Sequence, residues 1–184
     1  MIDPLPQLAA ALLLAVVFAT AAAAKLIELP TFAAVVENYR ILPRRLATPV
    51  AFILPVVELA TALGLLNPTT RPVAAGGAAI LLGVFAIAIG INVRRGRLTI
   101  DCGCFRSTLR QQISWWMVLR NLMLMALALL ALPEATARVP GLADYLLAGF
   151  GAAALFALYL AVGAVTLPPP RRYEDNYRAS LGQA

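Results

Sequence analysis

The sequence has no histidine, few charged residues and only two cysteines, and each shortage excludes a class of protein. Without histidine there is no imidazole general base, histidine-ligated haem or histidine metal site. Charged residues make up 13% and hydrophobic residues 61% of the chain, against about 25% and roughly 45–50% in soluble domains. We therefore expect an integral membrane protein with no sizeable soluble domain.

Five apolar stretches are long enough to cross a bilayer, since a spanning helix needs about 20 apolar residues. The chain, 1–184, is then a single integral membrane domain. We expect an all-α polytopic helix bundle, with a four-helix core, a fifth transmembrane helix and a short interfacial helix. A cleaved signal peptide is the alternative for the first span, but no Lys or Arg precedes it. The predicted spans and polar tail are about 5–24, 46–66, 73–93, 113–132, 145–167 and 168–184.

Local patterns refine the helices within this plan. Between Pro30 and Pro43, apolar residues recur at three- and four-residue steps, which predicts an amphipathic helix over Thr31 to Leu42 at the membrane interface. The capping-box spacing of Thr108 and Gln111 predicts that the fourth span begins near Leu109. In the third span, three glycines spaced seven apart form one smooth stripe, which we interpret as small-residue packing. They are Gly76, Gly83 and Gly90.

Lys and Arg are distributed unevenly among the connections between the spans. Twelve of the fifteen lie in one set of alternate connections and two lie in the other. Because cytoplasmic connections carry the excess of Lys and Arg, we predict a periplasmic N-terminus, with the C-terminus and the cysteine segment cytoplasmic. The excess charge then reflects topology and lipid contact rather than nucleic-acid binding. The two sets are 25–45, 94–114 and 168–184 against 1–4, 67–72 and 133–144.

The most polar interior stretch contains two cysteines separated by one glycine. Cys102 and Cys104 lie within or at the edge of disulfide reach, and the small ring that they would close is strained and readily reduced. Gly103 removes the side chain that would obstruct the turn. Arg106 and the start of the following helix favour the thiolate, whereas Asp101 opposes it and can shuttle a proton. The pattern favours a redox-active pair; structural thiols or a metal clip are the alternatives, although a metal needs further ligands.

Two charged residues, Glu58 and Arg120, lie within the predicted spans, and Lys25 directly follows the first span. Such charges cost about 2.5–3.5 kcal/mol each on insertion scales, so they usually face a partner or a cavity. Glu58 and Arg120 lie at similar depths, roughly 10–14 Å from the cysteine side at 1.5 Å per residue. We predict that Glu58 is buried and paired with Arg120 or with Lys25. Arg120 can instead snorkel towards the interface that Trp116 marks.

Four segments together resemble one known family of membrane proteins. They are the Ala-Lys-Leu end of the first helix, the run 37–43, the span segment 55–60 and the motif 101–105. The resemblance is to the MauE family of methylamine utilisation proteins, in the wider MauE/DoxX group of redox-associated membrane proteins. It covers nearly the whole chain, but Arg106 stands where the family's motif continues with a small residue.

This resemblance implies a role in maturing methylamine dehydrogenase, whose small subunit is periplasmic and rich in disulfides. It also implies MauD, a membrane-anchored thioredoxin-like protein, as a partner. Cys102 and Cys104 match the family's motif, so they are the functional residues that the resemblance implies. We expect a redox accessory protein of the bacterial inner membrane, acting as a thiol–disulfide oxidoreductase component. No cofactor is expected beyond the disulfide, and a quinone is left open.

Two other functions stay open beside the redox relay. A non-enzymatic scaffold would hold MauD or the unfolded subunit, with Cys102 and Cys104 structural. A transporter is weaker, because the spans contain few charges. The relay itself meets a difficulty, since the charge distribution predicts cytoplasmic cysteines while the implied substrate is periplasmic. Transfer of reducing equivalents from inside to outside, or a segment that re-enters the membrane, would reconcile the two.

Overall fold

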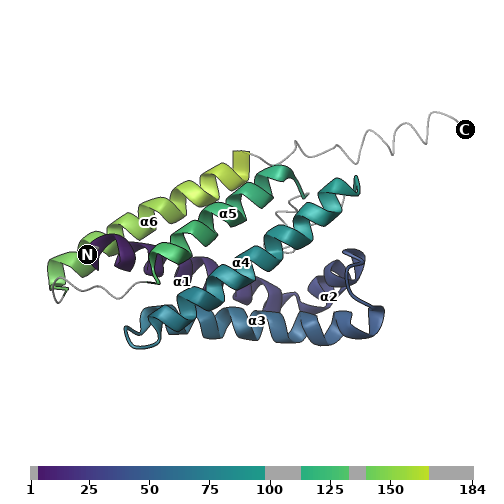
Figure 1. Cartoon of the computed structure of the whole chain (residues 1–184), viewed down its shortest axis with the longest axis horizontal. Helices are drawn as coiled ribbons and strands as arrows, with labels where there is room; N and C mark the ends of the chain where they lie inside the picture. The colour runs from purple at the N-terminus through teal and green to yellow at the C-terminus, as the bar shows by residue number, and fades with distance from the viewer. Residues whose placement is uncertain (1–3, 98–112, 133–139, 166–184) are drawn as a thin grey trace, which may run out of the picture.

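The computed structural model describes residues 4–97, 113–132 and 140–165, and these residues form six α-helices (Figure 1). Four of the helices, α1, α3, α4 and α6, are long and apolar enough to cross a membrane. The all-α polytopic architecture predicted from composition is confirmed. In chain order the helices are α1 (Pro4–Ile27), α2 (Leu29–Asn38), α3 (Arg44–Leu66), α4 (Arg71–Arg94), α5 (Trp115–Leu130) and α6 (Leu142–Val165).

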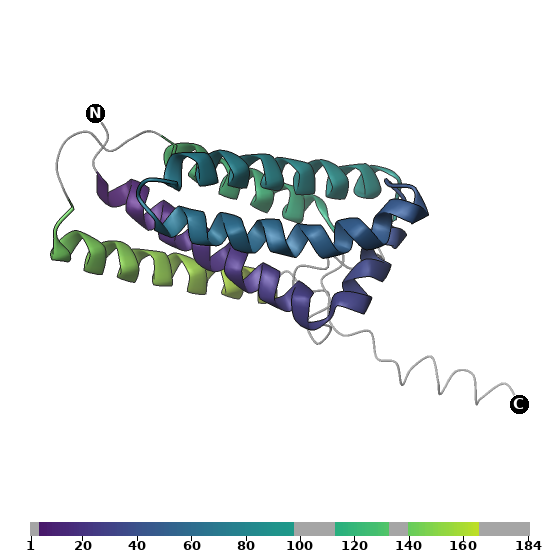
Figure 2. The ribbon, with the colours of Figure 1, turned by 90° about the horizontal axis from the view of Figure 1, so that it is seen from below.

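The helices pack as a bundle around α1 (Figure 2). Helix α1 packs against α3 and α6 and also meets α4 and α5. Helices α4 and α5 pack along each other, and α3 contacts both α1 and α4. Helix α6 is the least buried of the four long helices. The arrangement is therefore a four-helix core of α1, α3, α4 and α5, with α6 added against α1.

Helix α1 is the most buried of the four candidate spans. Leu14 and Phe18 of this helix are at most 2% exposed in the main core. Small residues from α3, α4, α5 and α6 surround them, because alanine lets helix backbones approach closely. A cleaved signal peptide at this position would remove the central helix of the bundle. The surrounding small residues are Ala62, Ala75, Ala78, Ala128 and Ala152.

The glycine stripe of α4 faces α5. An added Cβ at Gly76, Gly83 or Gly90 would have its nearest contacts with Leu132, Met125 and Val118, at 3.7, 3.6 and 3.9 Å. The three partners also recur every seven residues, in the opposite direction along the chain. Two antiparallel helices therefore meet along matched seven-residue repeats, and the small side of α4 accepts Val118 and Met125 of α5 and Leu132 just after it.

Two helix boundaries differ most from the sequence-based prediction. Helix α2 ends at Asn38 rather than Leu42, because Arg40 adopts a left-handed backbone conformation with φ of 48° that a helix cannot contain. Helix α5 begins at Trp115 rather than near Leu109, because Ser114 is extended, with φ of −150° and ψ of 165°. At 16 residues, α5 is about 24 Å long, shorter than the span predicted over 113–132.

The two ends of the bundle carry different structures. Helix α2 lies at one end, together with the end of α4 and the start of α5, which flank the cysteine segment (Figures 1 and 2). We call this the α2 end. The turn between α3 and α4 and the start of α6 lie at the opposite end (Figure 1). Which compartment each end faces stays a prediction.

Candidate functional site

The cysteine motif lies outside the described residues, as do its neighbours Asp101, Gly103 and Arg106. The structure describes the backbone on either side of it. After α4, Arg97 Nη1 donates a hydrogen bond to the carbonyl oxygen of Asn38 at 3.1 Å. Arg95 Nη1 donates to the carbonyl oxygen of Arg40 at 3.4 Å. The chain that leads into the cysteine segment is therefore attached to the C-terminal end of α2.

The chain that leaves the cysteine segment is attached by apolar contacts. Ile113 is 1% exposed and forms a small core with Ile89 and Val93 of α4 and Met117 of α5. Tyr39, which follows α2, packs against the same cluster. Both flanks of the segment therefore rest on α2 or on the residue after it, which gives the predicted interfacial helix a structural role at this end.

Inside the bundle, Lys25 of α1 and Glu58 of α3 form a buried ion pair. The two residues are 4% and 0% exposed. Lys25 Nζ also lies 5.5 Å from the ring centroid of Phe32 in α2 and 5.2 Å from that of Phe85 in α4. Ring faces attract a cation, so these contacts compensate part of its lost hydration. One ammonium group thus connects α1, α2, α3 and α4.

The structure pairs Glu58 with Lys25, one of its two predicted partners. Arg120 is 9% exposed, so it points inward rather than snorkelling to the interface. Its guanidinium carbon lies 5.1 Å from the ring centroid of Tyr159 in α6. The guanidinium therefore stacks on an aromatic ring between α5 and α6, while the carboxylate of Glu58 is engaged on α1.

A cavity of about 40 Å³ lies beside these groups. Lys25, Glu58, Arg120, Asn121 and Tyr159 provide polar atoms in its lining. Glu58 Oε2 is buried and has no hydrogen-bond partner among the described residues. A cavity of this volume can hold water molecules, since one needs about 10–15 Å³, whereas an organic ligand needs a pocket several times larger. The arrangement can therefore hydrate a carboxylate within the membrane span.

Sequence reasoning missed several residues around this cavity. Asn121 is 5% exposed and donates from Nδ2 to the carbonyl oxygen of Met117 at 2.8 Å. Tyr159 and Phe85 provide the rings that contact Arg120 and Lys25. A polar or aromatic residue within an apolar run was the available signal. It did not show which helix each side chain faces. Within the described ranges, no three acidic or cysteine residues lie together as a metal site.

Together, the fold and these sites define a polytopic helical membrane protein. A buried Lys–Glu pair joins its helices, and a two-cysteine motif lies between α4 and α5. A family profile described as "Methylamine utilisation protein MauE" matches residues 4–134. The chain belongs to this family.

Two relatives show how far the similarity extends. A protein of Paracoccus denitrificans is 49% identical over 141 residues, which cover 76% of this chain and 75% of the relative. A protein of Paracoccus versutus is 46% identical over 173 residues, which cover 92% and 91%. Both are named methylamine utilization protein MauE. No solved structure matches the chain.

Proposed function

We propose that this protein is a redox accessory protein for the maturation of methylamine dehydrogenase. Its relatives carry the name of methylamine utilisation proteins, and that name supports a role for this chain in methylamine utilisation. The observation that carries the redox part is the pair Cys102 and Cys104, which are the chain's only cysteines. Thiol–disulfide exchange is the chemistry that such a closely spaced pair supports best.

The described residues on either side of the motif are fixed to the bundle. Arg97 holds the incoming chain on α2, and Ile113 holds the outgoing chain in a small core. The motif is thereby tied at both flanks to the α2 end of the bundle. A partner protein can approach this end from the aqueous phase without entering the helix bundle.

The proposed exchange transfers two electrons between this chain and a thioredoxin-like partner, MauD. A thiolate of the partner attacks one sulfur of the Cys102–Cys104 disulfide, which forms a mixed disulfide and releases the other cysteine as a thiolate. The partner's second thiolate then attacks the mixed disulfide. The partner leaves as a disulfide, and this chain is left with two thiols. The reverse sequence reduces the partner instead. The only redox group that this scheme requires of the chain is its cysteine pair.

Replacement of the cysteines tests the proposal. We expect Cys102→Ser and Cys104→Ser, singly or together, to abolish assembly of active dehydrogenase while membrane insertion continues. Dehydrogenase activity and the amount of the variant in the membrane fraction are the two measurements. Ser107→Ala, in the same segment, is the matched control and should retain assembly. Single-cysteine variants should also trap a mixed disulfide with the partner.

A scaffold would behave differently in this experiment. It would hold MauD or the unfolded small subunit without exchanging electrons, so the double serine variant would still support full assembly. That result would replace the relay with the scaffold.

We further propose that the protein lies in the bacterial inner membrane with its N-terminus periplasmic and its C-terminus cytoplasmic. The concentration of arginines at the α2 end supports this orientation. Reporter fusions after Asn67 and after Ser107 should then report opposite sides, with the Ser107 fusion cytoplasmic. A periplasmic reporter at Ser107 would reverse the orientation and place the cysteines on the side of the implied substrate.

A further inference from the structure

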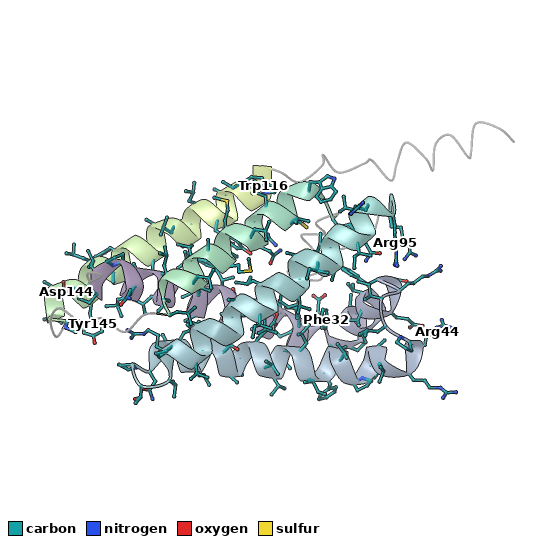
Figure 3. All side chains as sticks on the ribbon, viewed as in Figure 1. Phe32, Arg44, Arg95, Trp116, Asp144 and Tyr145 are labelled. Carbon is teal, nitrogen blue, oxygen red and sulfur yellow. The ribbon has the colours of Figure 1, made fainter. Side chains whose placement is uncertain are left out.

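The α2 end of the bundle carries a cluster of exposed arginines, which we call the arginine rim. Figure 3 labels two of its members, Arg44 and Arg95, at this end. Among the described residues the opposite end has one basic residue, Arg71, and its Nε donates to the carbonyl oxygen of Leu65 at 3.2 Å. The rim consists of Arg40, Arg44, Arg45, Arg94 and Arg95.

Helix stability does not explain the two arginines that begin α3, whereas Arg94 lies in the last turn of α4, where positive charge favours the helix dipole. Arg44 and Arg45 form the first turn of α3, where positive charge opposes the helix dipole, and no acidic residue lies in that turn. Arg44 is paired with Glu37, which compensates one charge at this end. Positive charge still exceeds negative charge there, so the rim attracts an anionic partner.

Exposed apolar side chains lie beside the rim and indicate that the anionic partner lies at the membrane surface. Five of them, between α1 and the start of α3, are 38% to 61% exposed. Trp115 and Trp116, in the first turn of α5, are 58% and 36% exposed. Aromatic residues of this kind mark the level of the lipid headgroups. The apolar residues are Leu26, Ile27, Ile41, Leu42 and Leu46.

We propose that the arginine rim binds the headgroups of anionic phospholipids. Guanidinium groups bind phosphate through paired hydrogen bonds, and the neighbouring apolar side chains contact the acyl chains. Arg45 lies at the start of α3 and Arg94 at the end of α4, so headgroup binding connects two helices of the core at the α2 end. The site is independent of the cysteine chemistry proposed above.

Lipid enrichment measures this binding directly. The full chain is reconstituted in vesicles of phosphatidylcholine and phosphatidylglycerol, extracted gently, and the retained lipids are identified by mass spectrometry. We expect phosphatidylglycerol to be enriched over its share in the vesicles. In Arg45→Gln/Arg94→Gln the enrichment should fall by about fivefold for each arginine, the contribution typical of a basic residue at an anionic surface. An unchanged enrichment in this variant would overturn the proposal.

Two control variants separate charge from position. Arg45→Lys/Arg94→Lys keeps both charges and should keep most of the enrichment, also serving as the test if the glutamine variant fails to fold. Arg71→Gln removes a charge at the opposite end and should change nothing. An equal loss in Arg71→Gln would contradict the assignment to the rim.

Two further outcomes would identify another ligand. If inorganic phosphate displaces the retained lipid completely, the rim binds a free anion and the phospholipid proposal is wrong. If the unsubstituted protein shows no preference for phosphatidylglycerol, the proposal is also wrong, and an acidic protein surface becomes the partner to test. Retention of phosphatidylglycerol in the presence of phosphate supports the lipid.

Discussion

Two ion pairs in the described part of the chain have similar chemistry in different surroundings. In the interior, the side chains of Lys25 and Glu58 are 3% and 1% exposed. At the α2 end, those of Arg44 and Glu37 are 88% and 41% exposed. Water screens the second pair and hydrates each partner when it separates, whereas the first pair has little access to water. Equivalent contacts therefore have very different consequences when one partner is lost.

The comparison also shows what the interior pair does. Removing a charge from water is costly, and mutual attraction repays this only when both partners are present. The pair therefore restricts how α1 and α3 can pack, and it is not a simple gain in stability. Lys25 also restricts the packing of α2 and α4, because it contacts the rings of Phe32 and Phe85. The exposed pair imposes no comparable restriction.

The largest effect is expected from Glu58→Ala, which leaves the ammonium of Lys25 buried without its carboxylate. Breaking a buried pair in this way destabilises a protein by about 3–5 kcal/mol. Unfolding of the purified protein in mixed detergent micelles, followed by circular dichroism, measures the change. Glu37→Ala is the matched control at the exposed pair. Equal losses of stability in the two variants would show that burial does not distinguish the two ion pairs.

A double-mutant cycle between Lys25 and Glu58 measures the coupling energy of the buried pair. Because the two side chains contact each other directly, Lys25→Ala/Glu58→Ala should be less destabilised than the sum of its single variants, with a coupling of about 1–3 kcal/mol. The same unfolding assay applies. The parallel cycle of Glu58 with Arg120 should show a smaller coupling, since Arg120 contacts Tyr159. A larger coupling with Arg120 would contradict the observed pairing.

The smallest effect is expected from Glu37→Gln at the exposed pair. Surface ion pairs contribute about 0–1 kcal/mol, so the midpoint of unfolding should barely move. The small difference should shrink further as salt is added, because exposed charges are screened. Unfolding curves at low and high ionic strength check this. A loss of stability comparable to that of Glu58→Ala would show that the exposed pair stabilises the fold as much as the buried pair does.

Most of the helices could be predicted from the sequence because the pattern that specifies each helix is local. A run of about 20 apolar residues specifies a span whatever it packs against. The expected ends of α1, α3, α4 and α6 differ from the observed ones by only a few residues within the described ranges. The exceptions, at Arg40 and Ser114, are single residues whose backbone conformation ends or delays a helix. Hydrophobic patterning does not register such backbone angles.

Some parts of the candidate site could likewise be predicted from the sequence, and others could not. Cys102 and Cys104 are neighbours in the chain, so the sequence alone identified them as a pair and, through the family's motif, as the residues to test. The structure describes how their flanks attach to α2 but not the cysteines themselves. The cavity beside Glu58 could not be found from the sequence, because helices distant in the chain provide Asn121 and Tyr159.

By itself, the sequence determined the helical membrane class, the concentration of arginines at one end and the membership in the MauE family. It also showed that Glu58 needs a partner, since a lone carboxylate in a membrane is costly. Only the tertiary structure decided that the partner is Lys25 and that Arg120 stacks on Tyr159. The depth of a residue follows from its position along one helix, whereas pairing depends on the rotation and neighbours of two helices, which only their packing fixes.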